Sequence, residues 1–360
     1  MKEFQIGTKI LCGPGTAQRL KDVNAKKLLV VTDPYFAENG TAQKIAAAAG
    51  AQQVQLFDRV APDPTVELVA EGTAIVKEFA PDVIVALGGG SAMDCAKAML
   101  YFAGGNIRLV AIPTTSGSGS EVTDFAILTH ENVKHPLIDS YLRPEIAILD
   151  DDLVAGLPKS LVADGGFDAL SHALEALAAQ NANPFTDALA KDAFCCAFSS
   201  LPASFAGDRQ ARGDVHIAAT MAGMAFTQAG LGVCHALSHS LGGMFHLPHG
   251  RLNAILLPAV VSCNASAAGE KYAKLARAAG LGGSVETIAV RNLKNALIRL
   301  RRELRLPETL AQAGVDPREI GYRMGDIIQA ALKDPCCRTN PVKLDAAMLR
   351  KLLEEVTGRG

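Results

Sequence analysis

The sequence predicts an α/β fold in which a doubly wound parallel sheet, residues 1–159, is followed by an all-helical domain, residues 160–360. In the first part, short β-branched runs alternate with helical patterns, and this order is typical of a parallel sheet with crossover helices. From about Leu161 onward these runs stop, and Ala-rich amphipathic segments separated by short Gly or Pro breaks follow. A chain of 360 residues is also long enough for two domains.

The sheet domain is expected to contain at least four strands. Two of them, 27–32 and 82–87, are continuous apolar runs of the kind that is buried on both faces of a sheet. The expected strands are 27–32, 53–57, 82–87 and 109–112, with helices at 41–49, at 66–79 and before the last strand. Ligands of such sheets bind outside the carboxyl ends of the strands, so the residues that follow each strand are the candidates for a binding site.

The second domain is expected to be helical throughout. Its apolar residues recur with helical periodicity and no strand pattern interrupts them. The expected helices are 164–179, 186–198, 215–229, 235–244, 269–278, 285–304, 319–332 and 346–356.

Composition excludes several classes of partner and points to the cytoplasm. The formal net charge is −2, so there is no basic excess that would attract nucleic acid or anionic lipid. No uninterrupted apolar run reaches the length of a membrane span, and no apolar signal core follows the first four residues. The eight cysteines include the vicinal pairs Cys195–Cys196 and Cys336–Cys337 but no CxxC motif, so we interpret them as reduced thiols.

The segment from Gly232 to Gly250 carries the strongest chemical signal. It holds four of the eight histidines, and His235 and His239 are spaced to lie on one helical face. Asp168 and His172 form a second pair with the same spacing. A single pair of this kind is more often a surface ion pair, but a second pair, in a segment dense in glycine and histidine, favours a site for Fe(II) or Zn(II). Spacing alone offers more ligands than one ion needs.

Two strand ends carry residues that suit a cofactor phosphate. Strand 82–87 runs into three glycines, Gly88 to Gly90, which allow close approach to the backbone at a helix start. Alternatively, Ser91 and Asp94 have the spacing of a capping box and simply begin the helix. Strand 109–112 runs into a loop rich in hydroxyls and glycines, 114–120, which forms either a second wall of the site or a flexible polar loop.

A third strand end bears on the choice of cofactor. Asp33 follows strand 27–32 and could accept hydrogen bonds from ribose hydroxyls, which would favour NAD over NADP. The alternative is a turn-forming Asp before Pro34. The fingerprint G-x-G-x-x-G is absent, so the domain is expected to be Rossmann-like without the ordinary dinucleotide motif.

Taken together, the motifs resemble the iron-dependent (group III) alcohol dehydrogenase family over nearly the whole chain. The segments that carry the resemblance are 88–94, 112–123, 166–175, 222–226, 230–235 and 247–250. Within the family, segments 4–10, 62–65, 245–249 and 338–341 are most similar to the 1-propanol dehydrogenases of propanediol-utilisation microcompartments. The resemblance implies a dehydroquinate synthase-like fold, with a Rossmann-like domain followed by an all-α metal-binding domain.

The resemblance also implies roles for individual residues. The implied metal ligands are Asp168, His172, His235 and His249, and His239 matches a catalytic histidine near the substrate that is not a ligand. The implied cofactor contacts are Asp33, Asp63, Gly89, Gly90, Ser91, Asp94, Thr114, Thr115, Ser118 and Lys134. Asp63 stands where many members have Asn. The substrate pocket is expected to include Phe125, Phe226 and Cys336, and the role of His246 stays open.

The function implied is a metal-dependent NAD(H) alcohol dehydrogenase acting on short-chain primary alcohols and aldehydes, in the direction of propionaldehyde reduction to 1-propanol. The metal is expected to be Fe2+, with Zn2+ as the alternative. The rivals are a lyase of the dehydroquinate-synthase type, a glycerol or diol dehydrogenase, and an inactive scaffold component of a microcompartment. A homodimer or larger homo-oligomer is expected, in the cytoplasm or inside a microcompartment with its shell or lumen enzymes, and without nucleic acid or membrane.

Overall fold

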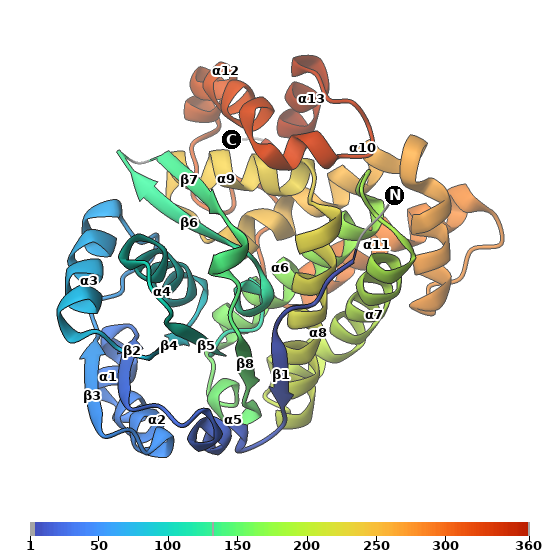
Figure 1. Cartoon of the computed structure of the whole chain (residues 1–360). Helices are drawn as coiled ribbons and strands as arrows, with labels where there is room; N and C mark the ends of the chain where they lie inside the picture. The colour runs from blue at the N-terminus through green and yellow to red at the C-terminus, as the bar shows by residue number, and fades with distance from the viewer. Residues whose placement is uncertain (1–3, 132, 359–360) are drawn as a thin grey trace. The chain divides into compact units, whose positions relative to one another are not determined.

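A computed structural model describes residues 4–131 and 133–358 (Figure 1). The chain divides into two compact units, which we call the sheet unit, Gln5–Leu157, and the helical unit, which begins at Pro158. Phe4 groups with the helical unit, and its ring stacks on Phe185 at 5.4 Å between centroids. The expected boundary after residue 159 falls two residues beyond this division, because the first long helix of the helical unit already begins at Lys159.

The sheet unit is built on a six-stranded parallel sheet with the order β1-β8-β5-β4-β2-β3. Its strands are β1 (Lys9–Cys12), β2 (Lys27–Val31), β3 (Gln53–Phe57), β4 (Val83–Gly88), β5 (Arg108–Pro113) and β8 (Ile146–Leu149). All five strand pairs of the sheet are parallel. The four strands expected from the sequence are confirmed, and the structure adds β1 and β8 at one side.

Helices cover both faces of this sheet, which explains the unbroken apolar runs. Along β2, Leu28 and Val30 join one core and Leu29 and Val31 join another, so successive side chains enter opposite cores. The helices of the unit are α1 (Pro34–Glu38), α2 (Thr41–Ala49), α3 (Val66–Phe79), α4 (Gly90–Ala103), α5 (Asp151–Val154) and the short 3-10 turns η1 (Thr16–Val23), η2 (Ser120–Val122) and η3 (Ser140–Leu142).

An antiparallel pair of strands that the sequence did not predict lies outside the main sheet. It consists of β6 (Phe125–His130) and β7 (Val133–Ile138) (Figure 1). Lys97 of α4 is fully buried and its Nζ donates to the Thr123 and Phe125 carbonyls, at 3.0 and 2.9 Å. This buried lysine therefore fixes the chain where it leaves the hydroxyl-rich loop and enters β6.

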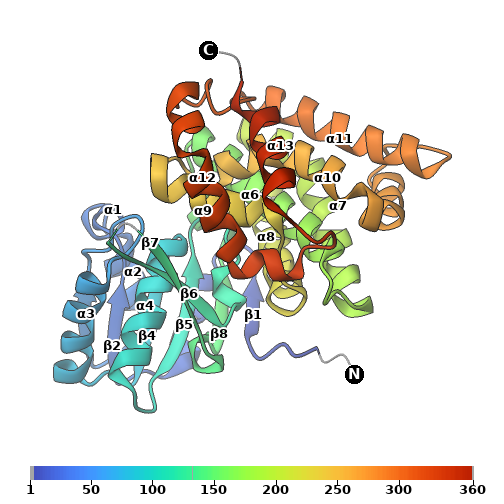
Figure 2. The same ribbon diagram turned by 90° about the horizontal axis from the view of Figure 1, so that it is seen from above.

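The helical unit contains no strand within its described residues, in agreement with the all-α expectation. Its helices are α6 (Lys159–Ala178), α7 (Pro184–Ala206), α8 (Arg209–Ala229), α9 (Val233–Phe245), α10 (His249–Ala278), α11 (Glu286–Glu303), α12 (Pro317–Lys333), α13 (Ala346–Thr357) and the 3-10 turn η4 (Pro335–Thr339). Helix α10 packs against both α6 and α11 (Figure 2).

Helix α10 begins earlier than residue 269, the start predicted from the sequence. The structure begins it at His249 and runs it for 30 residues through Pro258. By length and composition α10 could span a membrane, but 72% of its most apolar window is buried, as expected of a core helix. Among the described residues, α8 and α9 pass the same test only when counted together, and they are bent by 104°.

Candidate functional site

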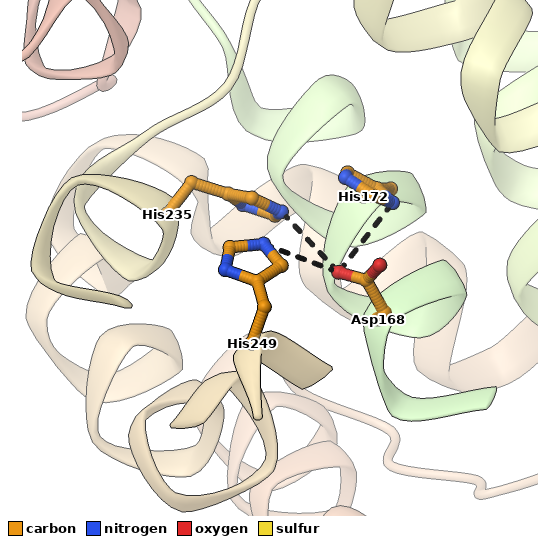
Figure 3. A group of neighbouring side chains, drawn as sticks. All are labelled: Asp168, His172, His235 and His249. Atoms are coloured by element: carbon orange, nitrogen blue, oxygen red, sulfur yellow. Dashed lines mark ion pairs between the residues drawn. The ribbon is translucent and has the colours of Figure 1, made fainter. Parts of the chain in front are cut away.

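Three imidazole rings of the helical unit converge on one carboxylate oxygen of Asp168 (Figure 3). The Oδ1 atom of Asp168 lies 3.8 Å from His172 Nδ1, 3.7 Å from His235 Nε2 and 3.5 Å from His249 Nε2. One ligand atom from each residue can be chosen so that all four lie within 4.8 Å of one another. All four implied metal ligands are therefore brought together, and three of them are buried.

The charges in this cluster are strongly coupled. Burial opposes ionisation of Asp168, but the three imidazoles outweigh it and hold the pKa of the carboxyl well below its usual range. Burial likewise disfavours a charged His235, yet the neighbouring Asp168 and Glu175 carboxylates raise its pKa to about 9. Burial and neighbouring imidazoles lower the pKa of His249 well below its usual value. At least one imidazole therefore offers a lone pair, which a metal requires.

The chemistry of these donors fits a divalent ion of borderline softness. One carboxylate and three imidazoles suit Fe(II) or Zn(II), and a buried cluster of this kind would be costly to maintain with only hydrogen bonds among its members. These four donors therefore suit the iron or zinc that the family resemblance implied.

Local sequence explains how three helices deliver these ligands. Asp168 and His172 lie one turn apart on α6, as the spacing predicted. His249 is the first residue of α10, directly after Pro248. Gly250 allows this end of α10 to approach α6, because a Cβ there would lie 2.0 Å from the Asp164 carbonyl oxygen. The ligand geometry therefore depends on one close backbone contact.

Two polar side chains at the cluster were not assigned by sequence. Asn253 is fully buried one turn after His249, and its Nδ2 donates to Asp168 Oδ1 at 2.8 Å. Glu175 is also buried and accepts from His235 Nδ1 at 2.6 Å. Glu175 lies three residues after His172, so the spacing along α6 could have placed it on the ligand face.

His239 lies next to the cluster. Its Nδ1 lies 2.8 Å from Asp334 Oδ2, and its ring stacks on His249 at 5.2 Å. The Asp334 carboxylate also accepts from the Cys336 amide, at 2.8 Å, and His239, Asp334 and Cys336 form a second group whose donor atoms lie close together. Cys336, expected in the substrate pocket, is therefore beside His239.

The remaining predicted residues of this unit have different surroundings. The Phe226 ring stacks on His172 with centroids 4.4 Å apart. His246 is exposed and ends α9 in the left-handed region, with its amide bonded to the Gly242 carbonyl at 2.9 Å. The described geometry gives His246 a role at the helix end and no place in the cluster.

In the sheet unit, the glycine turn and the hydroxyl-rich loop lie side by side. Gly88 pairs with Pro113 in the sheet, and the Thr114 amide donates to the Gly88 carbonyl at 2.9 Å. A Cβ on Gly89 would lie 3.2 Å from the Thr115 side chain, and one on Gly90 would lie 3.3 Å from Ser118. Glycines at these positions therefore leave room for the second loop.

The helix after the glycine turn has no side-chain cap. The N-cap of α4 is Gly89 and no side chain accepts from its first turn, so the capping box of Ser91 and Asp94 is not formed. The two Asp94 oxygens instead accept from the Ser120 hydroxyl, at 2.9 Å, and the Ile127 amide, at 3.1 Å. This geometry gives Asp94 an anchoring role, whereas the uncapped helix start suits a phosphate.

Asp33, Asp63 and Lys134 have partners within the sheet unit. Asp33 is the N-cap of α1 and accepts from the Phe36 amide at 3.2 Å, as a turn-former before Pro34 would. Its other carboxylate oxygen would lie 3.6 Å from a Cβ on Gly88, so it also lies beside the glycine turn. Asp63 and Lys134 form an ion pair of 2.7 Å. Phe125, expected in the substrate pocket, begins β6.

Comparison with known proteins identifies the family. Residues 7–151 match the family model described as iron-containing alcohol dehydrogenase, and residues 162–357 match that of the C-terminal part of the same family. The chain belongs to the iron-containing alcohol dehydrogenase family. It is thus an alcohol dehydrogenase that acts on small substrates, which sets aside a lyase of the dehydroquinate-synthase type.

Individual relatives support this membership. The chain is 41% identical to a 1-propanol dehydrogenase, PduQ, of Citrobacter freundii, covering 99% of this chain and all of the relative. It is 36% identical to an NADPH-dependent butanol dehydrogenase of Clostridium saccharobutylicum, with 98% and 97% covered. A sulfoacetaldehyde reductase of Bifidobacterium kashiwanohense, solved with NAD+, has a TM-score of 0.90 and 26% identity over the full length of both chains. The NAD and iron implied by sequence agree with these findings and with the Asp/His cluster.

Proposed function

We propose that the protein is an iron- and NAD(H)-dependent alcohol dehydrogenase that interconverts short-chain primary alcohols and aldehydes, and that it reduces propionaldehyde to 1-propanol. The observation that carries the proposal is the convergence of three imidazoles on the carboxylate of Asp168 in the helical unit. The substrate is inferred from the 41% identical relative, which is a 1-propanol dehydrogenase.

In this proposal Asp168, His172, His235 and His249 hold the ion. When bound, a divalent metal acts as a Lewis acid on the substrate oxygen, and NAD(H) accepts or supplies the hydride. The chain contributes position, because Asn253 fixes the Asp168 oxygen by a hydrogen bond of 2.8 Å and Phe226 packs on the His172 ring. Phe226 and Cys336 would limit the space for the substrate chain, and Phe125 is proposed as a third pocket residue.

His239 is proposed to move the substrate proton. Asp334 holds its Nδ1 at 2.8 Å, which leaves Nε2 as the ring atom that can take up or release a proton. The ring is also fixed by stacking on His249. A histidine that is positioned at the cluster without being a ligand is suited to this task.

The cofactor is proposed to bind at the glycine turn of the sheet unit. The uncapped start of α4 would receive the pyrophosphate, with Gly89, Gly90 and Ser91 close to it. Further contacts are proposed from Thr114, Thr115 and Ser118 of the neighbouring loop, and from Asp63 and Lys134. The Asp33 carboxylate would accept from ribose hydroxyls and repel a 2′-phosphate, so we propose NAD as the preferred cofactor.

The cellular setting is proposed from the same relatives. We propose a homo-oligomer in the cytoplasm, or enclosed with other enzymes in a microcompartment, on the basis of the 41% identity to the 1-propanol dehydrogenase PduQ. The sequence does not decide whether the first residues act as an encapsulation signal, and residues 1–3 lie outside the described part of the chain.

The proposal is tested by NADH consumption with propionaldehyde in anaerobic buffer after loading with Fe(II). We expect rapid loss of NADH absorbance that depends on both the aldehyde and the metal. If NAD+-dependent oxidation of glycerol or a diol proceeds with a higher kcat/KM, the protein is a polyol dehydrogenase instead. If no alcohol or aldehyde is turned over by metal-loaded protein, an inactive scaffold component is the better account.

A further inference from the structure

Glu175 is a buried carboxylate that contacts backbone amides and one imidazole ring. It lies on α6 with 2% of its surface exposed. Its oxygens accept from the backbone amides of Gly232, at 2.9 Å, and Cys234, at 2.7 Å. One of them also lies 2.6 Å from the ring Nδ1 of His235. These partners all belong to the start of α9.

The backbone contacts have a plain structural explanation. Helix α9 begins after Gly232 and has no side-chain cap of its own, so its first amides need acceptors from elsewhere. A carboxylate at a helix N-terminus is also stabilised by the helix dipole. Gly232 is required here, because a Cβ would lie 2.7 Å from a Glu175 oxygen. These contacts would hold α9 in place even if the protein bound no metal.

The contact with the His235 ring goes beyond capping. A carboxylate at 2.6 Å from Nδ1 holds a proton on that nitrogen, so Nε2 is the ring atom that gives up its proton when a metal binds. It is Nε2 that points to Asp168, at 3.7 Å. The tautomer that can bind a metal beside Asp168 is therefore selected by Glu175.

Asn340 provides an internal comparison, because it caps the same helix end without touching the ring. It is fully buried, and its Oδ1 accepts from the Val233 amide at 3.1 Å and from Asn264 at 3.0 Å. Both Glu175 and Asn340 therefore stabilise the start of α9, but within the described part of the chain only Glu175 is hydrogen-bonded to His235 Nδ1.

We propose that Glu175 is a positioning residue of the metal site: it fixes the His235 tautomer and adds a second negative charge, and thereby sets the metal affinity. Asp168 and Glu175 together supply two negative charges for a divalent ion, although only one of them would contact it. Outer carboxylates of this kind raise the basicity of a ligating imidazole. The inference rests on the proposed ligand set.

The test compares Glu175→Gln with Asn340→Ala. Metal-free protein of each variant is titrated with Co(II) in competition with a chelator, and thermal unfolding is followed in the absence of metal. We expect both variants to unfold at lower temperature than the wild type, because both lose a cap on α9. Only Glu175→Gln should lose metal affinity, by about 10- to 100-fold, while Asn340→Ala should stay within about threefold of the wild type.

The Co(II) absorption spectrum supplies a second readout that capping alone would not change. A reoriented His235 ring should shift the visible bands of Glu175→Gln and leave those of Asn340→Ala unchanged. If Glu175→Gln does not fold, Glu175→Asp replaces it, because it keeps the charge but withdraws the carboxylate by one methylene. In the same titration Glu175→Asp should bind Co(II) more weakly than the wild type, by less than the loss of about 10- to 100-fold expected of Glu175→Gln.

His235→Ala separates failure of this inference from failure of the proposed function. If His235→Ala retains full Co(II) affinity, the ligand assignment itself is wrong. If His235→Ala loses the ion but Glu175→Gln binds it as tightly as the wild type, the ligand set stands and the role of Glu175 is overturned. Equal loss of affinity in Glu175→Gln and Asn340→Ala would also overturn it, since the effect would then come from capping.

Discussion

At the scale of single residues, buried charges are paired in a way that fixes both histidines of α9. Glu175 contacts His235, and Asp334 contacts His239 one turn later. Burial would raise the pKa of the Asp334 carboxyl, but its hydrogen bond with His239 outweighs burial and lowers the pKa to about 2. Each carboxylate orients an imidazole toward the cluster and is itself stabilised by it.

The lowered pKa of Asp334 predicts a pH-dependent contribution to stability. Because the folded value lies below the ordinary value of 3.8, the contribution is fully present above about pH 4 and is lost as the pH falls toward 2. A shift of this size corresponds to roughly 2 kcal/mol. Asp334→Asn should therefore lower the free energy of unfolding at pH 6 by about that amount.

Urea unfolding of the wild type and Asp334→Asn at pH 6 and pH 3 checks this prediction. The difference between the two proteins should be large at pH 6 and should shrink at pH 3. A difference that is the same at both values would show that Asp334 acts through shape alone and not through its charge.

At the scale of elements, the site is made where helix ends approach other helices. α9 and α10 each present a histidine in the first turn, and α6 carries the remaining two proposed ligands. The approach of α10 to α6 is possible only because residue 250 has no side chain. Backbone atoms at Asp164 cannot move aside as a flexible side chain could.

We therefore predict that Gly250→Ala separates α10 from α6 and displaces His249. A Cβ at 2.0 Å from the Asp164 carbonyl oxygen should lower the free energy of unfolding by roughly 1–3 kcal/mol or more and weaken metal binding. Gly325→Ala is the matched control, because Gly325 lies on the exposed face of α12 with no atom near its Cβ position.

Chemical denaturation and metal content measure both effects. Gly325→Ala should stabilise the helix by about 0.5–1 kcal/mol and leave metal content unchanged. Normal stability and full metal content in Gly250→Ala would show that the contact between α6 and α10 yields more easily than the structure implies.

Sequence periodicity placed site residues correctly where those residues lie close together in the chain. The pair Asp168 and His172 could be placed on one face because both lie on α6, and the glycine turn could be placed at a strand end. The contact of Glu175 with His235 joins residues 60 positions apart, so no local pattern contains it. The start of α10 was missed because Pro258 resembles a helix end, whereas the buried surroundings of this helix tolerate it.

At the scale of the whole molecule, the proposed cofactor site and the proposed metal site belong to different units. The proposed cofactor contacts lie in the sheet unit and the proposed metal ligands in the helical unit. Each half should therefore respond to its own substitutions. A change at the glycine turn should alter the choice of cofactor, and a change among the histidines should alter metal content.

For the sheet unit we predict that Asp33→Gly relaxes the preference for NAD. Removing a charge that would repel the 2′-phosphate should raise the ratio of kcat/KM for NADPH to that for NADH by about tenfold or more. Asp22→Gly, which removes a charge before β2 instead of after it, should leave the ratio unchanged. An unchanged ratio in Asp33→Gly would remove the proposed role of this residue.

For the helical unit, the metal content of His249→Ala tests the central claim most directly. Purified protein is loaded anaerobically with Fe(II), freed of excess ion and analysed for bound metal, with His246→Asn as the control because His246 is exposed and outside the cluster. NADH binding, which is proposed to depend on the sheet unit, should be the same in both variants. The account predicts about one ion per chain in the wild type and in His246→Asn, and at least about tenfold less in His249→Ala. Undiminished metal and normal turnover in His249→Ala would contradict it.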